Sequence, residues 1–278
     1  MIKPTEPLPE IREREAPPEI AAIYDDIRRC AALPQVNLIF RHLATRPPIL
    51  EWVWQSLRPI YLSKNLAEAA TELSRSVPVV APSPLPDRLD ATERMECRTV
   101  LGAYNSGNPQ NLIALTAFAQ ALDGASRSSA SELLPRTDAT GQTIAQAAPF
   151  PPIPRRDDLS TEVARALDRL ASRHRVVAGV IPSLYVHLVL WPQLLEPVDA
   201  FLGVCCETCD WTSAVDDVIA TAAATARDLA PHLALSPPPG IDETETQAMA
   251  ETIRTFINTT IPEMVIVGRW LAWDDAAA

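Results

Sequence analysis

One short pattern occurs twice in this chain, and the duplication constrains the fold more than any other feature of the sequence. Residues 40–47 (FRHLATRP) return in outline as residues 185–192 (YVHLVLWP). An aromatic residue, a histidine, a leucine and a proline are each displaced by the same distance, 187 − 42 = 145 residues. A motif that recurs with its order preserved indicates an internal repeat.

Other matches follow in the same order along the two halves. The apolar face of residues 19–27 returns at 162–170, and Asn105–Pro109 returns as Asn258–Pro262. Between them lies a segment rich in Ser, Thr, Gly, Ala and Pro that has no sustained periodicity, as is typical of a linker. We therefore predict an N-terminal arm, a first helical repeat, a linker and a second helical repeat, at residues 1–18, 19–122, 123–154 and 155–278.

Within each half the apolar residues recur at helical spacing, for example Ile20, Ile23, Tyr24 and Ile27. No stretch alternates with period two between hairpin turns, so we predict an all-α fold. In the first half we expect one helix that begins at residue 19 and further helices over residues 36–45, 49–57, 64–76, 90–104 and 110–122. We expect a turn at Asn105–Pro109, before the last of these helices. We expect the two repeats to pack as a pseudo-dimer with a ligand site in the cleft between them.

The composition excludes several classes of partner. The formal net charge of −11 repels nucleic acid and anionic lipid, and no apolar run approaches the roughly 20 residues of a membrane span. We expect a cytoplasmic protein that binds a small molecule, without cofactor or metal, since it has no phosphate-binding glycine loop and no paired metal-ligand motif. The sequence leaves open whether two copies of the chain form a homodimer.

Five cysteines without a secretory signal make a disulfide framework improbable, and Cys206 and Cys209 leave a redox role as a minor alternative.

Two of the four histidines, His42 and His187, occupy equivalent positions in the repeats. Imidazole titrates near neutral pH, so a pair facing one cavity could supply one acid and one base. The alternative is that each is a satisfied core histidine kept by the duplication. Tyr185, which precedes His187 by two residues, completes the set of candidate catalytic residues, although buried aromatic residues more often belong to the core.

The candidate substrate-binding residues lie near the helix starts and the proline turns of both halves. Ser183 and Asn37 could donate hydrogen bonds to a carboxylate, or could cap helices instead. Arg41 and Arg46 could bind an anionic substrate, although exposed arginines are more common. The remaining candidates are Gln35, Leu38, Leu184, Trp191, Asn105 and Asn258.

Three segments resemble the group I haloacid dehalogenases, which act on both stereoisomers of 2-halocarboxylic acids. They are Ile23–Arg28, the proline break followed by Arg-x-Leu-Ala-Thr-x-Pro at Leu33–Pro47, and Asn105–Pro109. The resemblance implies an all-α fold of two repeats with the site between them. It also implies that an aspartate of the second repeat activates the water that displaces halide from C2 with inversion.

The aspartate of that family falls on a leucine in this chain. Counting back from Trp191-Pro192, the Ser-Asp pair of the family corresponds to Ser183-Leu184, and its asparagine before Trp-Pro corresponds to Leu190. Its aromatic residue after the first-repeat proline corresponds to Gln35. Leucine cannot accept a proton, and His187 lies one helical turn away as the nearest replacement.

The sequence therefore favours a diverged dehalogenase-like enzyme in which His187 and His42 perform acid–base chemistry on a small organic molecule. Isomerisation, cyclisation or elimination would suit such a pair, and specialised metabolism is a plausible setting. One alternative is hydrolytic dehalogenation of a 2-haloacid with a substituted base. The other is a non-catalytic binder of an apolar ligand, because Leu184 and Leu190 would make the pocket more apolar.

Overall fold

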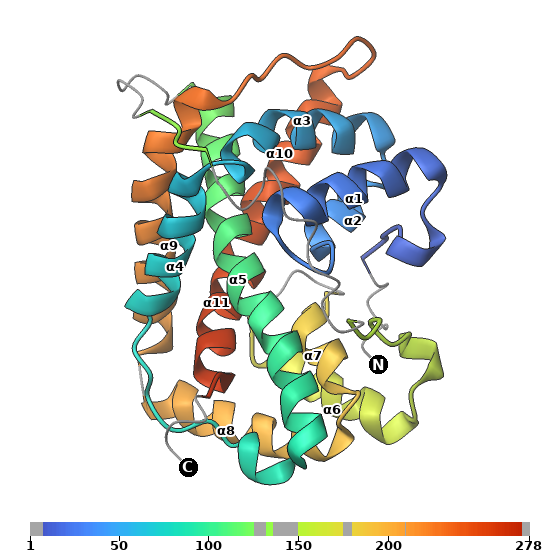
Figure 1. The fold of residues 1–278 in the computed structure, drawn as a ribbon, viewed down its shortest axis with the longest axis vertical. Helices are drawn as coiled ribbons and strands as arrows, with labels where there is room; N and C mark the ends of the chain where they lie inside the picture. Colours follow the sequence, from blue (N-terminus) through green and yellow to red (C-terminus); the bar gives the residue numbers. More distant parts are fainter. Residues whose placement is uncertain (1–7, 125–131, 136–149, 175–179, 209, 274–278) are drawn as a thin grey trace.

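The computed structural model describes residues 8–124, 132–135, 150–174, 180–208 and 210–273 (Figure 1). Within these ranges the chain is helical, and its β structure is one isolated bridge between Ser63 and Pro135. The predicted all-α class is confirmed. None of the described helices has both the length and the apolar character needed to cross a bilayer.

The first half contains five α-helices where the hydrophobic pattern predicts six, because the last two predicted helices are one. They are α1 (Pro18–Ala31), α2 (Leu38–Leu43), α3 (Pro47–Tyr61), α4 (Lys64–Ser76) and α5 (Ala91–Leu122). The second half follows the same order, with its last helix interrupted once. Its helices are α6 (Thr161–Ser172), α7 (Ser183–Leu188), α8 (Leu195–Thr208), α9 (Trp211–Leu229), α10 (Glu243–Asn258) and α11 (Thr260–Leu271).

Local chemistry explains where these helices begin. Ser63 caps α4 by accepting a hydrogen bond from the Leu66 amide, and Asp90 and Glu93 form a reciprocal capping box at the start of α5. Proline occupies the first turn of α1 and of α3, where its missing amide proton is not needed. Helix α2 is shorter than expected because Asn37, inside the predicted helix, has an extended backbone and caps it.

The turn predicted at Asn105–Pro109 is wrong, because α5 continues through Pro109 as one helix. A proline inside a helix removes a hydrogen bond and costs about 3 kcal/mol. Here residues 107 to 119 are buried, and burial of side chains such as Leu112 and Phe118 contributes about 1.5–3 kcal/mol each. The equivalent segment of the second half does break, at Thr259 between α10 and α11.

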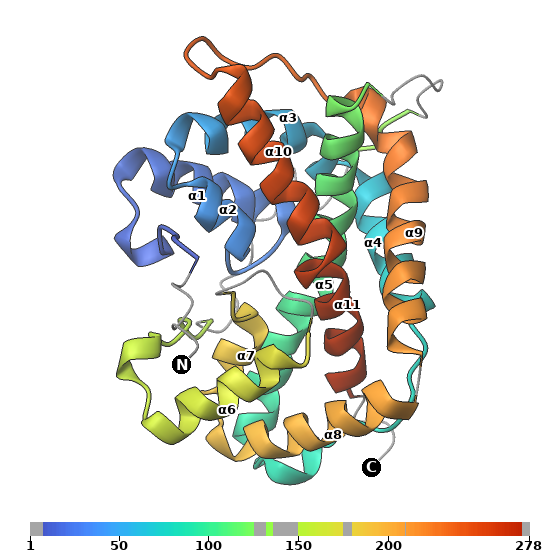
Figure 2. The ribbon, with the colours of Figure 1, turned by 180° about the vertical axis from the view of Figure 1, so that it is seen from behind.

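Helix α5 lies at the centre of the molecule and joins the two halves. It packs against α4 of its own half and against α9, α10 and α11 of the other half (Figures 1 and 2). The buried residues of both halves form one hydrophobic core. The halves therefore fold around a common centre, and their relation by an approximate two-fold axis, like the proposed repeat boundaries, stays a prediction.

The crossing of α5 and α11 is close at Gly268. A Cβ atom at this position would lie 2.2 Å from Oδ1 of Asn105, so an added methyl group forces the amide to move. Asn105 of α5 therefore faces α11. The two helices approach closely at this point because Gly268 has no side chain.

We expect Gly268→Ala to lower the free energy of unfolding by about 1–3 kcal/mol through overpacking. In the Asn105→Ala background the same change should cost much less, because the clashing amide is gone. Denaturant unfolding of the four proteins measures this coupling. Gly102→Ala is the matched control, since its Cβ would meet nothing within 4 Å. Equal losses in both backgrounds would contradict the proposed contact.

Candidate functional site

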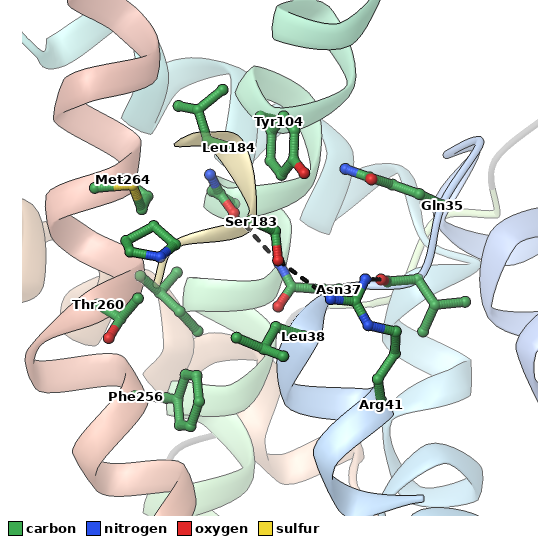
Figure 3. A pocket seen from close by; sticks show the side chains of 14 residues that line it. Gln35, Asn37, Leu38, Arg41, Tyr104, Ser183, Leu184, Phe256, Thr260 and Met264 are labelled. Atoms are coloured by element: carbon green, nitrogen blue, oxygen red, sulfur yellow. Dashed lines mark hydrogen bonds between the residues drawn. The ribbon is translucent and has the colours of Figure 1, made fainter. Parts of the chain in front are cut away.

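A small cavity lies where α2, α5, α7, α10 and α11 meet, between the two halves (Figure 3). Its volume is about 30 Å³, which is room for one or two water molecules. The first half supplies a mainly polar wall, consisting of Gln35, Val36, Asn37, Leu38, Arg41, Tyr104 and Asn108. The second half supplies a mainly apolar wall, consisting of Pro182, Ser183, Leu184, Phe256, Thr260, Ile261 and Met264.

Arg41 is the only charged residue in this lining, and it is buried, with 4 % of its surface exposed. Its Nε donates to Glu10 at 2.6 Å, its Nη1 to the Val36 carbonyl at 2.9 Å and its Nη2 to the Ser183 hydroxyl at 3.2 Å. A guanidinium has five N–H donors, so donors remain for an anion in the cavity. Figure 3 shows the contact that Arg41 makes across the cavity to Ser183.

Three polar atoms in the lining have no hydrogen-bond partner within the described chain. They are the side-chain Oε1 of Gln35, Nδ2 of Asn108 and Oγ1 of Thr260, and all three residues are buried. An unpaired buried polar group costs about 1–3 kcal/mol, so such groups ordinarily have a partner in water or ligand. Three of them around one cavity indicate a site built to receive a polar ligand.

Tyr104 connects this cavity to His187. The Tyr104 hydroxyl lies 2.7 Å from Nδ1 of His187, and Nε2 of His187 lies 2.9 Å from the Pro151 carbonyl. A carbonyl can only accept, so Nε2 carries the proton and Nδ1 accepts from the tyrosine. Both side chains are buried, and they form a neutral pair whose hydroxyl end faces the cavity.

Burial shifts the pKa values of both groups away from neutrality. It lowers the pKa of His187 to about 4, with the charge of Arg41 as a smaller cause, and the Pro151 carbonyl opposes the shift. Burial also raises the pKa of Tyr104 far above its ordinary value, while Arg41 and Gln35 counteract it. The imidazole is therefore neutral at physiological pH and about as weak a base as a carboxylate.

Six of the residues proposed from the sequence line the small cavity: Gln35, Asn37, Leu38, Arg41, Ser183 and Leu184. Asn37 also caps α2 through Oδ1 and donates through Nδ2 to Asn108 at 3.3 Å. Ser183 is not a cap, because Pro182 occupies the capping position of α7 and the serine hydroxyl accepts from Arg41.

The two equivalent histidines do not meet. His42 is half-buried, holds the Pro9 carbonyl with Nδ1 at 2.7 Å and lines no described cavity. His187 lines a second, larger cavity together with Arg41. The sequence left open whether the two imidazoles share a cavity, and the structure does not bring them together in one.

The other proposed residues also lie outside the cavity. Tyr185 is buried against His174, and Trp191 is part of the core. Asn105 faces Gly268, and Asn258 is exposed, where it donates to the Arg254 carbonyl. Leu190, expected to make the pocket more apolar, is 38 % exposed on the surface.

Sequence reasoning missed a buried polar cluster in the second half. Nε2 of His174 lies 2.5 Å from the Tyr185 hydroxyl, and its Nδ1 lies 3.0 Å from the Glu263 carboxyl group, with the side chains of His174 and Glu263 fully buried. Tyr185 follows the cavity residue Leu184, and Glu263 precedes the cavity residue Met264. The cluster therefore holds α7 against α11 behind the cavity.

No set of three or more His, Cys, Asp or Glu side chains suited to a metal ion occurs among the described residues. Cys206 forms no disulfide within the described residues, and its proposed redox partner Cys209 lies outside them.

The chain is similar in sequence and in fold to 2-haloacid dehalogenases. The chain is 30 % identical over 203 residues to a configuration-inverting 2-haloacid dehalogenase from Alcaligenes xylosoxydans xylosoxydans, an alignment that covers 68 % of this chain and 66 % of the relative. The chain is a homologue of the 2-haloacid dehalogenases. No protein-family model matches it.

Solved structures of dehalogenases share the fold. A D-2-haloacid dehalogenase in complex with L-LA superposes with a TM-score of 0.79 at 21 % identity, covering 95 % of both chains. A mutant of such an enzyme with D-2-CPA gives a TM-score of 0.77 at 20 % identity, covering 95 % of this chain and 96 % of that one. The dehalogenase homologue thus keeps the whole architecture of these enzymes.

The lowered pKa of His187 predicts a pH-dependent stability. Above pH 6.5, the ordinary histidine value, neither the folded nor the unfolded state binds the proton. Below it, only the unfolded imidazole is protonated, so the free energy of unfolding falls as the pH decreases, by about 3 kcal/mol at pH 4. Between pH 7 and pH 4.5, wild type should therefore lose about 2–3 kcal/mol more than His187→Gln in urea unfolding.

Tyr104→Phe is the control for this measurement, because it keeps the buried imidazole and should keep most of the pH dependence. If wild type and His187→Gln lose the same stability between the two pH values, the imidazole does not have the environment described above.

Proposed function

We propose that the dehalogenase homologue binds the reacting end of a 2-substituted carboxylic acid in the cavity between its halves and displaces the substituent with water. The observation that carries this proposal is the hydrogen-bonded pair of Tyr104 and His187, which brings a proton acceptor to a cavity lined by no carboxylate. The loss of the catalytic aspartate at Leu184, implied by the resemblance, is part of the proposal.

The buried cation gives the substrate carboxylate a place to bind. Arg41 has N–H donors to spare beside the Ser183 hydroxyl, and the unpartnered Asn108 amide lies in the same lining. Charge-assisted hydrogen bonds to a carboxylate are about twice as strong as neutral ones. The C2 substituent would then lie against the apolar wall that includes Leu184 and Met264.

The proton would leave the cavity through Tyr104. As the water oxygen forms its bond to C2, the halide departs with the electron pair of the broken bond. A water proton passes to the Tyr104 oxygen while the tyrosine proton passes to Nδ1 of His187, so no free phenolate forms. The neutral imidazole has the base strength of the carboxylate that it would replace.

Two other functions remain as proposals. Isomerisation, cyclisation or elimination could use the same phenol–imidazole pair, since proton transfer is what this pair offers. A non-catalytic binder would need only the cavity and its apolar wall.

We expect halide release from racemic 2-bromopropionate, with kcat about 10²- to 10⁴-fold lower in Tyr104→Phe and KM little changed. The phenylalanine keeps the ring and removes only the hydroxyl. A Tyr104→Phe protein with wild-type turnover would exclude the relay through Tyr104.

We also expect Arg41→Met to raise KM by about 10- to 100-fold, because it removes a charge-assisted contact worth about 1.5–3 kcal/mol. Arg46→Met is the matched control, since Arg46 is exposed and pairs with Glu245 at the surface. Equal effects of the two changes would argue against carboxylate binding at Arg41.

Absence of halide release at high enzyme concentration would exclude hydrolysis. Deuterium uptake at C2 of bound carboxylic acids, followed by NMR, would then support the acid–base alternative. Stabilisation by a carboxylic acid without either reaction would support the binder.

A further inference from the structure

A second cavity of about 610 Å³ adjoins the small one. Its walls come from the N-terminal arm, from the break after α1 and from the segment 150–154, and no function has been assigned to it above. The arm is fixed in place, because the Ile11 amide donates to the Arg41 carbonyl at 2.9 Å and Tyr24 donates to the Ile11 carbonyl at 2.8 Å. The large cavity is therefore a built feature of the fold.

The two cavities share a wall. Gln35 and Arg41 line both of them. Tyr104 lines the small cavity, and its partner His187 lines the large one. A ligand held by Arg41 thus lies at the boundary, with the reacting groups on one side and the large cavity on the other.

The sizes of the two cavities point to a substrate in two parts. The small cavity, at about 30 Å³, admits only the reacting end of a molecule. The large cavity, at about 610 Å³, has the volume of pockets that bury a whole drug-sized ligand, roughly 300–1,000 Å³. A three-carbon haloacid would leave nearly all of it unused.

The charges around the large cavity nearly cancel. Five arginines and four acidic residues line it, a formal sum of 5 − 4 = +1. Glu10 pairs with Arg41 and Arg12, Glu13 with Arg28, and Glu15 with Arg155. With the excess of one positive charge, the site fits a single carboxylate and gives no preference to a polyanion.

The segment 150–154 supplies an apolar wall. Phe150, three prolines and Ile153 line it between residues 150 and 154, and the Phe150 ring packs edge-on against His187 at 5.2 Å between centroids. Proline has a fixed φ, so this wall loses little conformational entropy when a ligand binds. Such a surface suits an aliphatic chain or an aromatic ring.

We infer that the large cavity binds the tail of the substrate, and that the substrate is a monocarboxylic acid with an extended, uncharged, apolar tail. The inference rests on the proposed function for the position of the carboxylate at Arg41. It extends that function by naming the substrate class and by assigning the second cavity.

The test compares acids of increasing tail length. Halide release is measured with 2-bromopropionate, 2-bromohexanoate and 2-bromo-4-phenylbutyrate, and binding is measured by calorimetry with propionate, hexanoate and 4-phenylbutyrate. Each buried methylene should raise affinity about three- to fourfold, so hexanoate should bind about tenfold or more tightly than propionate. The brominated series should show the same order in kcat/KM.

A variant that fills the cavity locates the effect. Ile153→Trp should weaken hexanoate binding by about fivefold or more and leave propionate binding unchanged, because the indole occupies the tail site. Ile153→Ala, which removes apolar contact instead, should weaken hexanoate binding by a few fold. Val79→Trp is the matched control, since Val79 is an exposed aliphatic residue that lines neither cavity.

The two proposals fail separately in these measurements. If longer tails bind more tightly, Ile153→Trp abolishes this gain and no halide is released, the tail site is supported and the proposed hydrolysis is excluded. Turnover of 2-bromopropionate without any gain from a longer tail overturns the tail site and keeps the proposed function. A gain from tail length that Ile153→Trp and Val79→Trp affect equally also overturns the assignment to this cavity.

Discussion

The structure depends on the continuity of α5 through Pro109. The proline removes one hydrogen bond of the helix. The free energy gained by burying this part of α5, which packs against α9 and α11, outweighs that loss. Because the helix does not break, Tyr104 and Asn108 are separated by four residues of regular helix and share one face. That face is turned to the small cavity, so the site exists only because the proline is tolerated.

The sequence predicts the helices well where apolar periodicity and capping residues agree. Helix α4, for example, begins at Lys64 after its Ser63 cap and ends at Ser76 as expected. The prediction fails at Asn105–Pro109, because a turn motif describes local preference and the outcome here is decided by tertiary burial. The domain boundaries, the location in the cell and the association of two copies stay predictions.

The residues of the candidate site were also predicted only in part from the sequence. Ser183 and Asn37 were expected from their places at helix starts, and both line the cavity. Tyr104, Asn108 and Thr260 were missed, because the first two lie on a helix that the sequence pattern divides and the third has no distinctive neighbour. Had the helix been predicted as continuous, the spacing of Tyr104 and Asn108 would have placed them on one face. The burial of Arg41 could not be read from local sequence, since its partner Ser183 is 142 residues away.

Arg41 also makes the two halves unequal. The predicted repeat pairs it with Val186, 145 residues later, and the lining of the small cavity receives a cation from the first half alone. Two identical halves around a cleft could hold a ligand in either of two orientations related by a half-turn. Here one wall carries the charge and the three side-chain amides, and the facing wall is mainly apolar, with the hydroxyl groups of Ser183 and Thr260 as its polar side-chain groups. A molecule with one acidic end therefore fits between the two walls in one orientation, so the site has a defined polarity.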